Sequence, residues 1–295
     1  MPDVAPSKAS RPRPRIALVV GSGGIKCAAA VGMWRVLQQE GIQPDMVIGC
    51  SGGSIYMAGM ALGRSAEEAE SYSHEMWNGL FKRMHYPSLI RGLLPRLFGF
   101  NERIGLVDDS AVAARLKHLF GSKRFVDANI PLHIAATDLH SGERVTLNSG
   151  LIADAVRASI AMPLLLRPWQ LDGRLLIDGG VSDPLPISLA IREGAEVILA
   201  MGFARPRVRR VESLLGFGNQ SMSIAINNLL HATYAFYSAA HHAEIIPIMP
   251  QFEQPIEISD TEFLPHIIEQ GEQATLAAIP YLRQLGLGRS EALAV

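Results

Sequence analysis

The segment Gly49-Cys50-Ser51-Gly52-Gly53 constrains the fold of this chain more than any other part of it. It follows a short apolar run at 46–48. A serine in a G-x-S-x-G pattern after such a run is typical of a nucleophile on a sharp turn from strand to helix. Gly49 and Gly53 permit positive φ angles and close approach of neighbouring backbone. The pentapeptide alone also fits an ordinary glycine-rich turn, so its interpretation depends on the rest of the chain.

Short apolar runs alternate with helical patterns along most of the chain. We expect strands at 15–20, 46–50, 131–138, 144–147, 175–177, 197–201 and 244–249, and helices at 26–39, 54–62, 65–77, 111–120, 151–161, 184–193, 224–240 and 263–285. Such alternation predicts an α/β fold with a mainly parallel central sheet and helices on both faces. Gly23, Ser51 and Asp178 each follow a predicted strand, and functional groups gather at the carboxyl ends of strands in such sheets.

Length and composition limit the domain organisation. The 295 residues, 48% of them hydrophobic and 19% charged, suit one large domain, which we place at 15–290. Residues 1–14 are rich in Pro, Ala and Arg, so we expect a disordered tail; they lack the apolar stretch of about 7–15 residues that a secretory signal needs. No run reaches the roughly 18 apolar residues of a transmembrane helix. We therefore expect a cytoplasmic protein, at most peripheral on the inner face of the membrane.

Charge and cysteine content exclude other classes. The formal net charge of −1 gives no indication of nucleic-acid binding. The two cysteines, Cys27 and Cys50, cannot form a disulfide framework, and no metal-ligand spacing surrounds them. We expect both to be buried free thiols in a reducing compartment.

Gly21-Ser22-Gly23-Gly24 separates the first predicted strand from a helix. Backbone N–H groups at such a helix start favour negative charge, which suits an oxyanion hole. A phosphate-binding loop is the alternative. Lys26, however, stands where a dinucleotide motif needs glycine, and the Walker pattern is absent, so we favour the oxyanion hole.

Asp178, in Asp178-Gly179-Gly180, is the candidate partner of Ser51. It is either a general base or the acceptor of an Asx turn that caps the next helix, and the sequence leaves both open. A carboxylate, with a usual pKa of about 3.9, is a weak base unless it is partly desolvated. A triad would need a histidine after the acid, and the chain offers His231, His241, His242 and His266. The first three fall in or at the end of a long helical pattern, where we expect surface positions.

At this point the motifs resemble those of a known family. Residues 21–27 (GSGGIKC), 49–53, 136–142 (ATDLHSG), 155–163 (AVRASIAMP) and 178–186 (DGGVSDPLP) resemble, in the same order, the patatin-like phospholipases in their smaller bacterial form. The resemblance is specific over about 15–203 and weaker over 204–290.

This resemblance implies a three-layer α/β/α sandwich that hydrolyses acyl esters of lipids, commonly phospholipids or lysophospholipids, without metal or other cofactor. It implies a Ser-Asp dyad, with Ser51 as nucleophile and Asp178 as base, and an oxyanion hole at Gly23 and Gly24. The positions that match the supporting motif residues are Gly21, Lys26, Gly49, Gly53, Gly179 and Gly180.

Two residues depart from the family's G-G-G-x-[KR]-G pattern. Ser22 replaces a glycine, and Cys27 replaces the last glycine with a larger side chain where the helix is expected to pack closely. A displaced oxyanion loop would favour a second hypothesis, a catalytically weak lipid- or membrane-binding regulatory protein on the same scaffold.

Cations lie beside apolar residues in two segments. Arg91 and Arg96 stand among the leucines of 89–98, and a basic loop at 204–218 ends in apolar residues. This combination suits transient contact with an anionic membrane surface, while a solvated basic loop beside ordinary core is the alternative.

Overall fold

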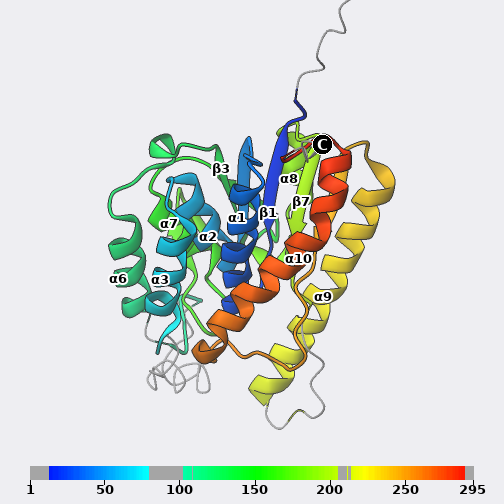
Figure 1. Cartoon of the computed structure of the whole chain (residues 1–295). Coiled ribbons are helices and arrows are strands. Elements are labelled where there is room, and N and C mark those ends of the chain that lie inside the picture. The colour runs from blue at the N-terminus through cyan, green and yellow to red at the C-terminus, as the bar shows by residue number, and fades with distance from the viewer. Residues whose placement is uncertain (1–12, 80–101, 108, 205–210, 212–213, 290–295) are drawn as a thin grey trace, which may run out of the picture.

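The computed structural model describes residues 13–79, 102–107, 109–204, 211 and 214–289 (Figure 1). Eight strands form one sheet in the order β5-β6-β3-β2-β1-β7-β8, with β4 paired to β3. The strands are β1 (Ile16–Val20), β2 (Met46–Cys50), β3 (Leu132–Asp138), β4 (Arg144–Leu147), β5 (Trp169–Leu171), β6 (Arg174–Asp178), β7 (Val197–Met201) and β8 (Glu244–Ile248). The five strands β3, β2, β1, β7 and β8 run parallel, and β4, β5 and β6 add antiparallel pairs beside β3.

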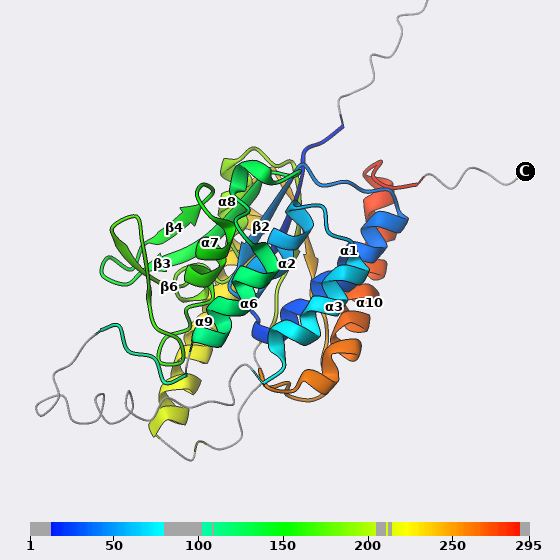
Figure 2. The same ribbon diagram turned by 90° about the vertical axis from the view of Figure 1, so that its left-hand side faces the viewer.

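Helices cover both faces of this sheet. They are α1 (Ala29–Gln39), α2 (Gly52–Ala61), α3 (Ala66–Trp77), α6 (Ser110–Phe120), α7 (Ile152–Ser159), α8 (Ile187–Arg192), α9 (Leu214–Ala240) and α10 (Leu264–Gln284), with short 3₁₀ turns η1 (Gly24–Ala28), η2 (Phe125–Asp127), η3 (Gly179–Val181) and η4 (Thr261–Phe263). Figure 2 shows α1, α3 and α10 on one side of the strands and α8 on the other. The expected three-layer α/β/α sandwich is thus confirmed.

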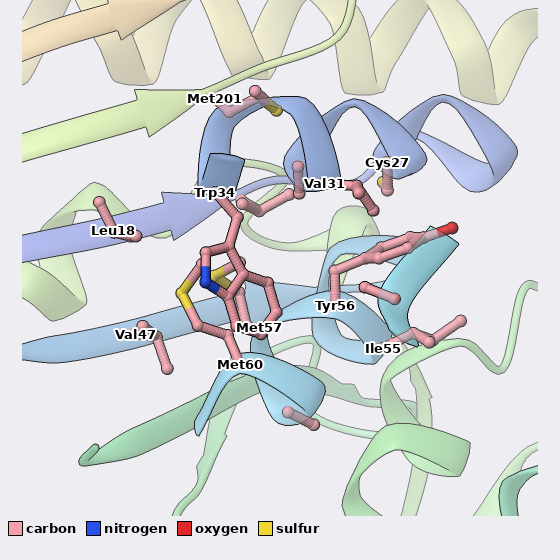
Figure 3. Packing of buried hydrophobic residues seen from close by; sticks show 14 of the residues in the cluster. Leu18, Cys27, Val31, Trp34, Val47, Ile55, Tyr56, Met57, Met60 and Met201 are labelled. Atoms are coloured by element: carbon pink, nitrogen blue, oxygen red, sulfur yellow. The ribbon is translucent and has the colours of Figure 1, made fainter. Parts of the chain in front are cut away.

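The two-residue period of the strands divides the core into two layers. In β1, Leu18 and Val20 face one apolar cluster with α1 and α2, while Val19 faces a second cluster with α8 and α9. Figure 3 shows part of the first cluster, where Trp34 of α1 lies with Met57 of α2. Every residue of α2 is buried, so this helix lies inside the protein with its N-terminus at the end of β2.

Helices α1 and α10 pack through two glycines. A Cβ atom at Gly32 would lie 2.1 Å from the carbonyl oxygen of Ile268, and one at Gly271 would lie 2.0 Å from that of Ala29. Neither helix can therefore carry a side chain at the crossing, and the two backbones are in direct contact.

Several sequence expectations differ from the structure in detail. The helix expected at 224–240 begins ten residues earlier, as α9 at Leu214. Gly216 and Gly218 lower the helix propensity of these first turns, so the sequence pattern did not indicate them. Strand β6 runs antiparallel to β3, so Asp178 reaches the site against the direction of the parallel strands. The expected tail at 1–14 and the segment with Arg91 and Arg96 lie almost wholly outside the described residues, and the domain boundaries stay predictions.

Among the described helices, none is both long and apolar enough to cross a membrane.

Substitution of Gly271 by alanine tests the helix crossing. We expect Gly271→Ala to lower the free energy of unfolding by about 3 kcal/mol or more, because the added Cβ forces the two backbones apart. The control is Gly218→Ala in α9, where a Cβ meets nothing within 4 Å and helix propensity predicts stabilisation by up to about 1 kcal/mol. Urea denaturation measures the free energy of unfolding of both variants. Equal changes in the two variants would contradict direct backbone contact between α1 and α10.

Candidate active site

Ser51 occupies the turn between β2 and α2 in a conformation that is rare for residues other than glycine. Its φ is 53° and its ψ is −129°. Such backbone strain costs on the order of 1–3 kcal/mol and persists where the surroundings enforce it. The flanking glycines allow this, because a Cβ at Gly49 would lie 2.4 Å from the Cα of Ser54 and one at Gly53 would lie 2.3 Å from the carbonyl oxygen of Val20.

Ser159, the last residue of α7, fixes the backbone of Ser51. The Ser51 N–H donates to Ser159 Oγ over 2.8 Å, and the Ser159 hydroxyl donates to the carbonyl oxygen of Ala135 in β3 over 2.6 Å. Ser159 is fully buried. One hydroxyl thus joins the strained turn to the neighbouring strand, and the Ser51 N–H is occupied by this bond.

The structure brings Ser51 and Asp178 into direct contact. The Ser51 hydroxyl donates to Asp178 Oδ2 over 2.5 Å, and both residues are 5% exposed. The other carboxylate oxygen, Oδ1, accepts from the backbone N–H of Gly180 over 2.7 Å, where Asp178 caps the turn η3. Asp178 therefore forms the expected Asx-type cap with one oxygen and contacts the Ser51 hydroxyl with the other.

The glycines after Asp178 allow the surrounding backbone to pack closely. A Cβ at Gly179 would lie 2.3 Å from the carbonyl oxygen of Ala135, and one at Gly180 would lie 2.7 Å from Ser22 Oγ. The hydroxyl of Thr137 in β3 donates to the Asp178 carbonyl over 2.9 Å. Asp178 is thereby held against β3 by its backbone as well as by its side chain.

Asp183 and Arg144 form an ion pair just after the turn η3. Arg144 of β4 forms an ion pair with Asp183 and also donates to Ser188. Burial raises the pKa of Asp183 above its usual value, although Arg144 opposes this shift. The pair connects the segment after Asp178 to the β3–β4 hairpin.

The glycine loop after β1 approaches the same site. Gly21 N–H donates to the carbonyl oxygen of Met201 over 2.9 Å, and Ser22 N–H to that of Pro184 over 2.8 Å. Gly24 has a φ of +59°, and a Cβ at Gly23 would lie 2.4 Å from the ring of Phe203. Glycine is thus required at both positions, at 24 by the backbone angle and at 23 by the neighbouring ring.

Lys26 and Cys27 fit into this loop without opening it. Lys26 is buried, with its ammonium group donating to the carbonyl oxygen of Ala204 over 2.8 Å. Cys27 Sγ lies 3.4 Å from the carbonyl oxygen of Gly21, and a Cβ at Gly52 would lie 3.0 Å from that sulfur. The missing side chain of Gly52 therefore makes room for the thiol. Cys50, the other cysteine, is also buried, as expected.

A pocket of about 470 Å³ opens beside Asp178. Gly23, Gly24 and Asp178 form part of its wall. The remaining lining is mostly apolar and comes from the first half of α9, from the turns η1 and η3 and from loop residues: Ile25, Lys26, Met162, Pro163, Leu165, Val181, Val211, Gly216, Asn219, Gln220, Met222, Ser223, Ile226, Ile256, Glu257 and Ile258. Such a cavity is of the size and character that ligand sites commonly have.

No described histidine contributes to this pocket. His231 lies exposed on α9, and His241 and His242 are exposed just after it. His266 lies on α10, with its ring 3.8 Å from Glu269. Among the described residues, no group of three or more His, Cys, Asp and Glu side chains is arranged to hold a metal ion.

A buried ion cluster supports one wall of the pocket. Asp109, before α6, binds both Arg157 of α7 and Arg167. The N–H groups of Leu106 and Val107, near this aspartate, donate to the carbonyl oxygens of 164 and 165. Arg157 is 2% exposed and its guanidinium lies 4.9 Å from the ring centre of Trp169. The cluster thus fastens the segment that carries Leu165 to the body of the protein.

Sequence reasoning missed Ser159 and this ion cluster. Ser159 lies in the stretch 155–163 that resembles a known family, but nothing in its local pattern indicates a contact with Ser51, 108 positions earlier. Asp109 and Arg157 look like ordinary charged residues of helical surfaces, and only the fold shows that they are buried.

The comparison with known proteins decides the family. The model for patatin-like phospholipases matches residues 18–191, more than half of the chain. The chain belongs to the patatin-like phospholipase family.

Relatives and a solved structure agree with this assignment. An uncharacterized NTE family protein of Mycobacterium tuberculosis is 31% identical over 188 residues, which are 64% of this chain and 49% of that protein. Human patatin-like phospholipase domain-containing protein 6 is 28% identical over 63% of this chain and 13% of its own length. The chain thus spans half or less of these curated relatives. The crystal structure of VipD from Legionella pneumophila has a TM-score of 0.50 at 15% identity, covering 92% of this chain and 68% of that one, and shows the same fold.

The buried cluster generates a prediction about stability and pH. Burial would raise the pKa of Asp109, but hydrogen bonds from Arg167 and Arg157 outweigh it and hold the pKa below its usual value. The cluster therefore stabilises the protein fully above about pH 4, and this contribution is lost as pH falls through the lowered pKa. We expect Asp109→Asn to lower the free energy of unfolding by about 3 kcal/mol at pH 7, because Arg157 loses its buried partner.

Urea denaturation at pH 7 and pH 3 measures this effect, and the difference between wild type and variant should shrink at the lower pH. Glu70→Gln is the control, because Glu70 pairs with Arg35 near the surface and should contribute at most about 1 kcal/mol. A variant at 109 no less stable than this control would refute the assigned function of the cluster.

Proposed function

We propose that this protein is a serine hydrolase of lipid acyl esters that works through Ser51 and Asp178. The observation that carries the proposal is the hydrogen bond from the Ser51 hydroxyl to Asp178 Oδ2 at the wall of a mostly apolar pocket. Membership of the patatin-like phospholipase family supports the reaction class.

In the proposed reaction, Asp178 removes the proton of Ser51 as the serine oxygen attacks the ester carbonyl. The alcohol leaves with a proton returned from Asp178, and an acyl-enzyme on Ser51 remains. A water molecule then loses a proton to Asp178 and attacks the acyl group. The bond between the acyl group and Ser51 breaks, the serine oxygen takes the proton from Asp178, and the fatty acid is released. Both half-reactions need one base and one nucleophile, and the contact between Ser51 and Asp178 supports assigning these roles to the two residues.

Two features of the site support this use of a carboxylate. Both partners are buried, and a hydrogen bond is electrostatically stronger in the protein interior than in bulk water. Ser51 also stands at the N-terminus of the buried helix α2, whose dipole favours negative charge on the serine oxygen.

We propose that backbone N–H groups at Gly23 and Gly24 hold the developing oxyanion. Both residues line the pocket beside Asp178, and the Ser51 N–H is already bonded to Ser159. Each donor of an oxyanion hole typically contributes on the order of 3 kcal/mol to the transition state. The fit of Cys27 beside Gly52 removes the main reason to expect a displaced loop.

The lining of the pocket supports an acyl chain as the bound part of the substrate. Side chains such as Met162, Met222 and Ile226 offer apolar contacts, and burial of methylene groups against them contributes about 0.8 kcal/mol each. We propose phospholipids or lysophospholipids as the substrate class, taken up during transient contact with a membrane.

Substitution of the dyad tests the function. We expect Ser51→Ala and Asp178→Asn each to lower hydrolysis by at least about 10³-fold, since either change removes a group needed in both half-reactions. Activity is measured with a short-chain soluble ester and with a panel of phospholipids and lysophospholipids. His266→Ala should retain full activity; loss of activity there, with Asp178→Asn still active, would replace the dyad by a triad.

Labelling with a fluorophosphonate separates this function from that of a lipid-binding protein without catalysis. We expect the wild-type protein to become labelled at Ser51. A folded protein that binds lipid but is never labelled would instead support the regulatory hypothesis.

Ser159→Ala tests how the nucleophile is positioned. Loss of the bond to the Ser51 N–H should lower kcat about tenfold and leave KM unchanged, because about 1.4 kcal/mol of positioning is lost. The fluorophosphonate labelling rate should fall in parallel. The control is Ser73→Ala in α3, an equally buried serine whose hydroxyl donates to the Ala69 carbonyl away from the site. Equal losses in both variants would mean that Ser159 acts through stability alone.

A further inference from the structure

Exposed apolar side chains gather where the pocket opens. Among the described residues ten large apolar side chains are exposed, and four of them flank this pocket. These four, which we name the mouth rim, are Leu164 (45% exposed), Val181 (36%), Val211 (40%) and Phe217 (62%). Val181 and Val211 line the pocket themselves. Single exposed apolar residues are common, but a group of them around one opening indicates an interaction surface.

The other two rim residues are direct neighbours of the pocket lining. Leu164 lies between Pro163 and Leu165, and Phe217 follows Gly216. Two rim residues therefore line the pocket, and the other two stand one position in sequence from its lining.

The backbone at Leu164, in the mouth rim, has an unusual conformation. Its φ is +70°, an angle that a branched apolar residue rarely adopts. The Leu106 N–H donates to the Leu164 carbonyl over 2.9 Å and holds this conformation, while the side chain stays 45% exposed. Strained residues of this kind concentrate at ligand-binding surfaces.

Helix α9 extends the rim with an uncharged surface. None of the 27 residues of Leu214–Ala240 is Asp, Glu, Lys or Arg, which is unusual for a helix with an exposed face. Its first turns reach beyond the end of the strands at the bottom of Figure 1, on the side of the site. Ile224, next in sequence to the pocket-lining Ser223, is a further exposed apolar side chain on this part of α9, at 52%.

We propose that the mouth rim docks on the surface of a lipid membrane, so that a lipid passes from the bilayer into the pocket. The proposal rests on the proposed function, because it takes the pocket as the site of a lipid substrate. A protein partner seated on the rim would close the pocket mouth, whereas a bilayer there supplies the substrate. No charge of the rim itself has to be removed from water on docking.

The neutrality of the rim also determines which membranes it prefers. Apolar insertion does not need anionic headgroups, so the mouth rim should bind zwitterionic vesicles at high salt. Docking through the arginines at 91, 96 and 205–210, in contrast, would require anionic lipid and weaken with salt. The two kinds of contact are therefore separable in one assay.

The experiment measures flotation of the full chain with phosphatidylcholine vesicles in about 0.5 M salt. Every protein tested also carries Ser51→Ala, so that no lipid is hydrolysed during the assay. We expect Phe217→Ser to weaken binding about tenfold, as the loss of a buried aromatic side chain implies. Leu164→Asn should weaken it similarly, and asparagine tolerates the positive φ, so the fold is preserved.

Phe236→Ser is the matched control. Phe236 lies on the same helix and is 61% exposed, but it stands near the far end of α9. The proposal is overturned if Phe236→Ser weakens binding as much as Phe217→Ser, if neither rim variant weakens it, or if only vesicles with anionic lipid bind. It is also overturned if Phe217→Ser abolishes self-association and the protein binds no vesicles.

A second readout separates this proposal from the proposed function. With Ser51 restored, the rim variants should lose hydrolysis of vesicle lipid more than hydrolysis of a short-chain soluble ester. A protein that hydrolyses neither would contradict the proposed function, while the flotation result would still decide the docking surface.

Discussion

The contact between the Ser51 hydroxyl and the Asp178 carboxylate is the constraint on which the rest of the site depends. Ser51 directly follows β2, which runs with the parallel strands, and Asp178 ends β6, which runs against them. Their meeting requires glycine at 49, 53, 179 and 180, because a Cβ at any of these positions would overlap a neighbouring atom. The glycine content of the motifs therefore follows from how closely three strands and α2 approach one another.

The buried polar groups around this contact hold it in place through separate links. Ser159 ties the turn of Ser51 to β3, Thr137 ties Asp178 to the same strand, and the Asp183–Arg144 pair holds the segment that follows. The ion cluster of Asp109 acts on a different part, the pocket wall near Leu165. Stability and site geometry are thus linked, since loss of one of these buried bonds would loosen an element that carries the site.

Much of this arrangement follows from local sequence. Apolar runs and glycine motifs predicted seven of the eight described strands, the turn at Ser51 and the approach of the glycine loop, because each depends on neighbouring residues. The three-residue strand β5 was not predicted. The direction of β6 did not follow, since an apolar run such as 175–177 has no direction of its own. The early start of α9 was hidden by Gly216 and Gly218, whose low helix propensity is overridden by the fold. Ser159 contacts Ser51 only in the tertiary structure, and no local sequence pattern predicts that contact.

The cap that Asp178 forms on η3 has a consequence for proton movement in the proposed reaction. Oδ1 is committed to the N–H of Gly180, and the carboxylate cannot rotate without losing that bond. The proton taken from Ser51 and the proton later taken from water must then reside on the same atom, Oδ2. The attacking water has to occupy nearly the place that the departing alcohol has left, so the second half-reaction can begin only after the first product has moved away.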